Sequence, residues 1–229
     1  MKFYHIALIM LISIALTNAK IVMLIRHGEK LNDKVTNLSP KGQTRAYCLI
    51  DLFKNVYATP QKIYAQSPTE KKQSTRPKDT VTPLAESLGL EVDLSYTSGK
   101  VKKLSNDILS SPEEVVLVSW SNDNIPDIAQ KLGVENPPEW DKDSFDNIWV
   151  IYDSTSASYV KNGNSQPIAT YSGNGVTMDI VSQNVETCIS QNIAQFQNGG
   201  SMTSGSEKIN YNFIIAIFSL LVCVFINLC

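Results

Sequence analysis

Histidine is scarce in this chain. The 229 residues include only two histidines, His5 and His27, and His5 falls in a segment that we expect to be removed. Any chemistry that needs an imidazole must therefore use His27. A Cys/His zinc site takes three or four protein ligands, which one histidine and two cysteines of a mature domain do not supply. We expect no metal and no cofactor.

Other common signatures are missing as well. Lys and Arg (20) do not exceed Asp and Glu (22), so the net charge of −2 makes nucleic acid an unsuitable partner. The chain shows no repeat and no low-complexity tract, and 229 residues with 43% hydrophobic content suit a single domain with appendages. A Ser-His-Asp arrangement stays open, although no Gly-x-Ser-x-Gly elbow is present.

The cysteines are few. Two of the four, Cys223 and Cys229, lie in a C-terminal segment that we expect to be lost, which leaves Cys48 and Cys188 for the folded domain. In an oxidising compartment these two can form a disulfide. The alternative is a pair of buried free thiols.

The N-terminal end has the pattern of a secretory signal. A basic start is followed by a short apolar run at residues 6–16 and by small residues at Thr17-Asn18-Ala19. This pattern predicts a cleaved signal peptide over residues 1–19, with Lys20 as the first mature residue. The alternative, one long anchor over residues 4–25, would consume the strand described below.

The C-terminal end has the pattern of an anchor signal. Residues 213–229 are almost uninterruptedly apolar and carry no basic flank, unlike a typical transmembrane helix. Asn198 with two glycines, followed by a polar spacer over residues 201–212, is typical of glycosylphosphatidylinositol (GPI) attachment. Attachment at Ser204-Gly205-Ser206 and a single-span tail are the alternatives. We therefore expect the mature protein on the outer face of the plasma membrane.

Residues 20–193 are expected to form the folded domain, with a polar linker over residues 194–212. Five apolar residues at 21–25 run directly into Arg26-His27-Gly28. Such a run indicates a strand buried on both faces. Open α/β sheets bind ligands beyond the carboxyl ends of their strands, so this junction is the first candidate site.

The rest of the domain alternates strands with helices before it changes character. A helix is expected to begin at Pro40 behind the hydroxyl of Ser39. Further helices are expected at residues 81–88, 101–109 and 125–132, and strands at 62–65, 115–118, 147–152, 157–160 and 167–171. We therefore predict an α/β three-layer sandwich, mainly parallel, with helices on both faces and an antiparallel C-terminal edge.

Several motifs resemble those of the histidine phosphatase superfamily, the phosphoglycerate mutase-like proteins. They are Arg26-His27-Gly28; Leu38-Ser39 with Gly42, Arg45 and Ala46; Ser74-Thr75-Arg76 with Thr80, Leu84 and Ala85; and residues 115–133. Residues 143–149 are similar to secreted fungal-type members. The resemblance implies a phosphoglycerate mutase-like fold.

The resemblance also implies roles for individual residues. His27 is the histidine that becomes phosphorylated, and Arg26 and Arg76 bind the phosphoryl oxygens. Asp123 takes the place of the general acid. Asn122 falls where the family has a second histidine, and an amide donates hydrogen bonds to a phosphoryl oxygen without carrying charge.

The sequence thus predicts an extracellular phosphomonoesterase with a weakened site, acting on a phosphorylated small molecule or phosphoprotein. The alternatives are an inactive surface pseudophosphatase that binds a phosphorylated or anionic ligand, and a structural protein with a relic pocket. Glu29 is a candidate accessory residue that orients the site or binds a substrate hydroxyl. The alternative is that Glu29 is a solvated charge in a loop. Asn37 begins a glycosylation sequon that Pro40 directly follows.

Overall fold

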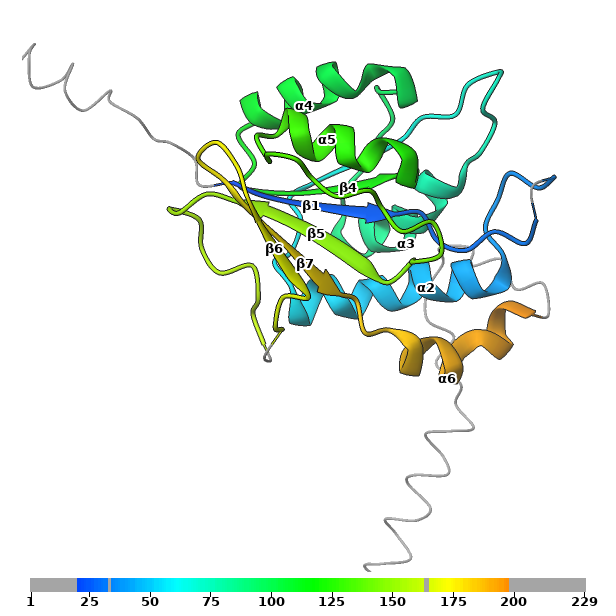
Figure 1. Cartoon of the computed structure of the whole chain (residues 1–229). Helices are drawn as coiled ribbons and strands as arrows, with labels where there is room; N and C mark the ends of the chain where they lie inside the picture. Colours follow the sequence, from blue (N-terminus) through cyan, green and yellow to red (C-terminus); the bar gives the residue numbers. More distant parts are fainter. Residues whose placement is uncertain (1–19, 33, 163–164, 198–229) are drawn as a thin grey trace, which may run out of the picture.

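One mixed sheet organises the chain in the computed structural model, which describes residues 20–32, 34–162 and 165–197 (Figure 1). The strands within these residues are β1 (Ile21–Arg26), β2 (Lys62–Ala65), β3 (Val92–Asp93), β4 (Val115–Trp120), β5 (Asn147–Tyr152), β6 (Ala169–Ser172) and β7 (Thr177–Ser182). They pair in the order β3-β2-β4-β1-β5-β7-β6. β3, β2, β4 and β1 are mutually parallel, whereas β5, β7 and β6 continue the sheet by antiparallel pairing.

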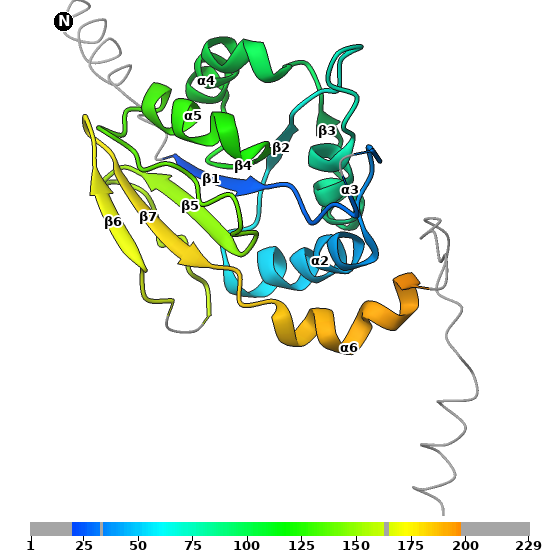
Figure 2. The same cartoon turned by 45° about the vertical axis from the view of Figure 1, so that its right-hand side comes forward.

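Helices cover both faces of this sheet (Figure 2). The α-helices are α2 (Pro40–Asp51), α3 (Arg76–Leu88), α4 (Val101–Ser110), α5 (Ile125–Lys131) and α6 (Glu186–Gln197). Short helical turns are η1 (Leu52–Val56), η2 (Ser98–Lys100) and η3 (Asn122–Asn124). α4 and α5 lie on one face, and α2, α3 and α6 lie on the other. The predicted α/β class with helices on both faces and an antiparallel C-terminal edge is confirmed.

β1 is central because both of its faces are apolar. Ile21, Met23 and Ile25 join the core cluster under α2, α3 and α6. Val22 and Leu24 join the cluster under α4 and α5. All five side chains are at most 3% exposed. Burial on both faces fixes the strand firmly, so the polar residues that follow it start from a rigid support.

α2 begins as its sequence predicts. The Ser39 hydroxyl accepts a hydrogen bond from the Gly42 amide at 3.1 Å, and Pro40 occupies the first turn. A Cβ atom at Gly42 would lie 2.5 Å from the Glu29 carbonyl oxygen. Glycine at this position therefore allows α2 to pack directly against the loop that follows β1.

α3 begins earlier than the sequence pattern predicts. The helix runs from Arg76 rather than Val81, and it contains Pro83 in its interior. Proline there removes one helical hydrogen bond. Val81, Leu84 and Ala85 are nevertheless all buried against the core, and this packing outweighs the local cost.

The predicted strand at residues 157–160 is wrong. Only an isolated bridge joins Val160 to Tyr57, and β6 and β7 supply the antiparallel edge instead. Within this stretch the Ser158 hydroxyl donates a hydrogen bond to the Val160 carbonyl at 3.0 Å and accepts one from the Val160 amide at 3.2 Å. Such local bonding gives the backbone a turn in place of a strand ladder.

β3, β7 and α6 were not anticipated from the sequence. α6 buries few side chains, among them Ile189 and Phe196, so its periodic signal is weak. α6 ends at Gln197, which places residues 194–197 in a helix rather than in the expected linker. The expected signal peptide (1–19), the attachment residue Asn198 and the apolar tail (213–229) lie outside the described residues. Within the described ranges, no helix has the length and hydropathy to cross a bilayer.

The disulfide between Cys48 of α2 and Cys188 of α6 is present, with a Cα–Cα distance of 6.0 Å. It closes a sequence separation of 140 residues and ties α6 to the domain. Reduction by dithiothreitol is therefore expected to lower Tm by roughly 5–15 °C, because an open chain gains entropy on unfolding. A Cys48→Ala, Cys188→Ala variant should show no response to the reductant. Alkylation of both cysteines in the non-reduced protein would contradict the pairing.

Candidate active site

The polar residues that follow β1, β4 and β2 meet at one edge of the sheet. Arg26, the last residue of β1, is paired with Trp120, the last residue of β4. The His27 amide then donates a hydrogen bond to the Trp120 carbonyl at 3.0 Å, and the Gln66 amide donates one to the Ser119 carbonyl. The parallel register thus brings three chain segments together.

A cavity of about 610 Å³ opens at this edge. Its walls are formed by Arg26, His27, Lys30, Lys34, Val35, Thr36, Gln66, Glu70, Lys71, Lys72, Gln73, Ser74, Arg76, Pro77, Ser121, Asn122 and Asp123. The structure therefore places five of the candidate residues around one space: Arg26, His27, Arg76, Asn122 and Asp123. Glu29 is not among the lining residues.

The ring of His27 has a defined orientation. Nδ1 lies 2.8 Å from the carbonyl oxygen of Gly28, and a carbonyl only accepts, so Nδ1 carries the proton. The lone pair is then on Nε2, which makes no hydrogen bond within the described residues. Because the ring lines the cavity, Nε2 is the atom available to an electrophile there.

The imidazole is neutral at physiological pH. Burial, joined by the positive charges of Arg76, Arg26 and Lys30, lowers the pKa of His27 to about 4, although the bond to Gly28 opposes this shift. A neutral imidazole retains the lone pair that nucleophilic attack requires.

The titration of His27 is testable in solution. Its ring NMR signals are expected to titrate near pH 4, and with two histidines in the chain they are readily assigned. Since this value lies below the usual 6.5, the stability contributed by the neutral ring is complete above about pH 6.5 and is lost as the pH falls through 4. A midpoint close to 6.5 would contradict burial of the ring.

The guanidinium of Arg26 is a buried cation that lines the same cavity as this ring. Its Nη1 donates hydrogen bonds to the carbonyls of Lys142 and Ser144, and its guanidinium carbon lies 4.0 Å from the centroid of the Phe145 ring. The residue is 7% exposed, and its buried Nε has no hydrogen-bond partner among the described residues. Burial lowers the pKa of Arg26, and the charge of Asp123 opposes this shift. A buried donor without a partner is a position where an anion is stabilised.

Arg76 lies at the start of α3. Its Nη1 donates a hydrogen bond to the Val35 carbonyl at 2.9 Å, which fixes the side chain on the cavity wall. The amino end of a helix carries partial positive charge, which adds to that of the guanidinium. Arg26 and Arg76 thus reach the cavity from different elements, and guanidinium groups are suited to bidentate hydrogen bonding with phosphoryl oxygens.

Asn122 and Asp123 lie in η3, directly after β4. The Asn122 amide group donates a hydrogen bond to the Asp123 carboxylate at 2.9 Å. Asn122 is half-buried and Asp123 is exposed, and both line the cavity. The cavity that contains His27 is therefore also lined by a neutral amide donor, and that donor is already hydrogen-bonded to the Asp123 carboxylate.

The carboxylate of Glu29 is bound by cations of α2. This carboxylate accepts hydrogen bonds from Nε and Nη2 of Arg45, the shortest at 2.8 Å, and lies 3.7 Å from Nζ of Lys41. Its side chain is 14% exposed. Burial raises the pKa of Glu29, but the bonds and charge of Arg45 outweigh burial and leave that pKa lowered. Glu29 joins the loop after β1 to α2 and does not line the cavity.

Gln66 is a cavity residue that the sequence argument did not single out. Its Oε1 accepts hydrogen bonds from the Ser121 hydroxyl at 2.8 Å and from the Ser121 amide at 3.3 Å. The bond fixes the turn that precedes Asn122. Its position directly after a strand, like that of His27, was the available signal.

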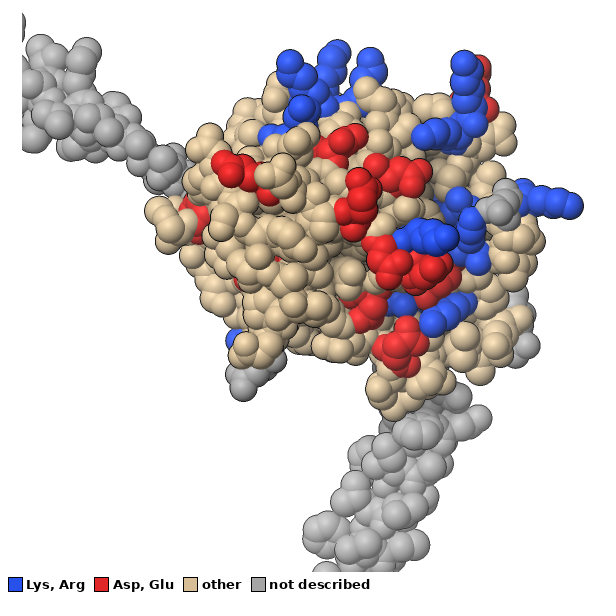
Figure 3. All heavy atoms as spheres, viewed as in Figure 1, with Lys and Arg blue, Asp and Glu red and all other residues tan. Residues whose placement is uncertain are grey.

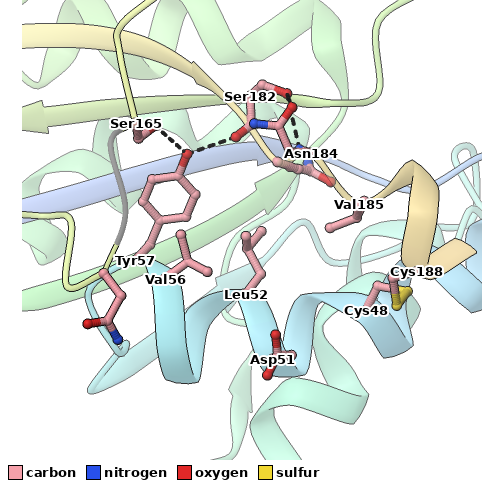
Figure 4. Close-up of a pocket in the computed structure, with 12 residues that line it drawn as sticks. Cys48, Asp51, Leu52, Val56, Tyr57, Ser165, Ser182, Asn184, Val185 and Cys188 are labelled. Atoms are coloured by element: carbon pink, nitrogen blue, oxygen red, sulfur yellow. Dashed lines mark hydrogen bonds between the residues drawn. A yellow bond between two sulfur atoms is a disulfide. The ribbon is translucent and has the colours of Figure 1, made fainter.

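A second cavity, of about 390 Å³, lies beside the disulfide (Figure 4). The Tyr57 hydroxyl is bonded there to the Ser182 carbonyl and to Ser165, each at 2.8 Å. The described residues that line this cavity include no Lys, Arg or His. Its chemistry therefore does not favour a phosphate. Across all the residues that the structure describes, no group of three or more His, Cys, Asp or Glu side chains is placed to hold a metal ion.

Comparison with known proteins adds little to this geometry. No family model matches the chain, and no curated protein matches it. A solved structure of SixA from Nakamurella multipartitia, a candidate phosphohistidine phosphatase, is similar at 15% identity and a TM-score of 0.38. The similarity covers 67% of this chain and 99% of that one. At this level, neither the family nor the activity of that protein transfers to this chain, whose function must be argued from its own residues.

Proposed function

We propose that this protein is a phosphomonoesterase that works through a phosphohistidine and has a weakened site. The observation that carries the proposal is the neutral imidazole of His27, whose Nδ1 is engaged by Gly28 and which lines the same cavity as the buried guanidinium of Arg26. A nucleophile without charge next to a fixed cation suits attack on an anionic phosphoryl group.

The chemistry takes two steps. Nε2 of His27 attacks phosphorus, so a P–N bond forms while the P–O bond to the alcohol breaks, and the alcohol oxygen takes a proton from the carboxyl group of Asp123. Water then attacks phosphorus, so a new P–O bond forms while the P–N bond to His27 breaks; one proton of the water passes to the carboxylate of Asp123, and inorganic phosphate leaves. Arg26 and Arg76 hold the phosphoryl oxygens throughout.

The site is weakened because Asn122 carries no charge. A charge-assisted hydrogen bond is about twice as strong as a neutral one. The bond from Asn122 to Asp123 favours a second candidate function, binding of a phosphorylated ligand without turnover, because it occupies both the donor and the acid.

The deciding experiment measures p-nitrophenyl phosphate hydrolysis by the full chain and by its His27→Ala variant. We expect slow turnover by the parent, none by the variant, and a phosphohistidine at position 27 that survives an alkaline quench. Equal turnover by both proteins would defeat the proposal. If neither protein hydrolyses p-nitrophenyl phosphate, the affinity of the parent for inorganic phosphate is measured. Loss of that affinity in an Arg76→Ala variant would establish the binding function instead.

We also propose that the protein acts at the cell surface, attached by lipid at Asn198. The Cys48–Cys188 disulfide supports an oxidising compartment, and the expected signals at both ends motivate the anchor. A phosphatidylinositol-specific phospholipase is then expected to release the protein from intact cells. Retention in the membrane pellet, while a control anchored protein is released, would favour a spanning tail.

A further inference from the structure

We propose that the cavity takes a small molecule that carries a second anionic group in addition to the phosphate at His27. Lys34, Lys71 and Lys72 form the subsite for that group, which we call the lysine subsite. The inference rests on the proposed function and names the substrate class of the same cavity.

The charge of the cavity wall exceeds what one phosphate needs. The lining residues include six cations, namely Arg26, Lys30, Lys34, Lys71, Lys72 and Arg76, and the carboxylates of Glu70 and Asp123. Arg26 and Arg76 already provide two guanidinium groups for one phosphoryl group. In Figure 3, Lys and Arg side chains project from the right-hand edge of the molecule, beyond the carboxyl end of β1 in Figure 1.

The lysine subsite is carried by two loops that are fastened together. Lys34 belongs to the loop after β1, and Lys71 and Lys72 belong to the loop after β2. The Thr75 amide donates a hydrogen bond to the Thr36 carbonyl at 3.0 Å. The bond from Arg76 to the Val35 carbonyl joins the same two loops. These contacts make the two loops one wall of the cavity, so the cations are held on the same side.

The second loop also has internal order. Thr69 and Lys72 exchange backbone hydrogen bonds of 2.9 and 3.1 Å, and the Thr69 hydroxyl accepts another from the Lys72 amide. Lys71 and Lys72 lie in this tight turn, and both line the cavity. Cations that line one cavity repel one another less when an anion lies between them, which favours a ligand of high negative charge.

The size of the cavity favours a small molecule. Its volume of about 610 Å³ lies within the usual range for ligand pockets. A sugar bisphosphate meets both requirements, since one phosphate reaches His27 while the other reaches the lysine subsite. An acidic phosphopeptide is the competing occupant.

The test compares the binding of fructose 1,6-bisphosphate and fructose 6-phosphate by calorimetry. The full chain with His27→Ala is used, so that neither ligand is hydrolysed. We expect the bisphosphate to bind about tenfold more tightly, the effect of one additional charge-assisted contact. Lys71→Ala with Lys72→Ala should reduce this ratio to about two, the statistical factor for two phosphates on one ligand.

The matched control is Lys102→Ala with Lys103→Ala. These exposed lysines lie on α4, outside the cavity, and removing them changes the net charge by the same amount. The control variant should keep the tenfold ratio. Equal ratios in the two double variants, or a ratio near two in the parent, would overturn the lysine subsite.

Two further results separate the inference from the proposed function. An acidic phosphopeptide that binds more tightly than the bisphosphate would overturn the small-molecule class. Absence of p-nitrophenyl phosphate turnover, with the bisphosphate preference intact, would defeat the phosphatase and leave the lysine subsite standing.

Discussion

Replacing Asn122 by histidine is expected to raise phosphatase turnover by about 10², the size of effect usually lost when one preorganised donor is removed. The reason is charge: an imidazolium stabilises the transferring phosphoryl group, whereas the Asn122 amide is neutral. Asn122 lines the same cavity as His27 and Arg26, so the new ring would face the reacting group. The measurement is kcat for p-nitrophenyl phosphate.

Histidine at position 122 would also change the partner of Asp123. The amide group of Asn122 now donates to that carboxylate at 2.9 Å. Removing this bond frees Asp123 to deliver its proton to the leaving group. The two effects act in the same direction, and both depend on the nucleophile.

Two variants control for other causes of a gain. Asn122→Gln keeps a neutral amide donor on a longer side chain, so its turnover should not rise. Asn122→His combined with His27→Ala should be inactive, because the gain requires attack by His27. A folded Asn122→His protein that binds phosphate but is no faster than the parent would show that the missing charge does not limit this site.

The elements that carry the site were predictable because their sequence signals are local and mutually consistent. A continuous apolar run fixed β1, and the serine cap with proline fixed the start of α2. Since both strands are parallel and adjacent, residues just after β1 and β4 had to meet. The meeting of Arg26, His27 and Asp123 in one cavity follows from these features.

Other features depend on partners that are distant in the sequence. The early start of α3 and the helical path of α6 are stabilised by packing that a local pattern does not contain. Glu29 is the clearest case, because its carboxylate is held by Arg45, 16 residues away. A charge beside a catalytic motif looks the same in sequence whether it faces a substrate or a buried partner.

Among the charged residues, Arg45 is expected to lower the free energy of unfolding most when it is replaced. Arg45 is buried in the domain and joins three segments of the chain. Its side chain is 2% exposed. Its Nη2 lies 2.8 Å from the carboxylate of Glu29 and 3.0 Å from that of Glu186, at the start of α6. Its Nη1 lies 3.3 Å from the carboxylate of Asp146, just before β5, and 2.9 Å from the side-chain oxygen of Gln183.

Arg45→Met keeps the apolar stem but leaves the buried carboxylate of Glu29 without its main partner. Breaking a buried ion pair by removing one side typically costs about 3–5 kcal/mol, because an uncompensated charge remains. The loss should appear in the free energy of unfolding measured with urea. It should shrink in the Arg45→Met, Glu29→Gln double variant, which no longer buries that charge.

Lys41→Met is the matched control for this loss. Lys41 contacts the same acids, Glu29 at 3.7 Å and Glu186 at 3.3 Å, but its side chain is 44% exposed. Exposed ion pairs contribute up to about 1 kcal/mol, so this variant should stay close to the parent. If Arg45→Met is no more destabilising than Lys41→Met, then burial does not strengthen the pair, and the loop after His27 must be held by another contact, such as the packing of Gly42 on Glu29.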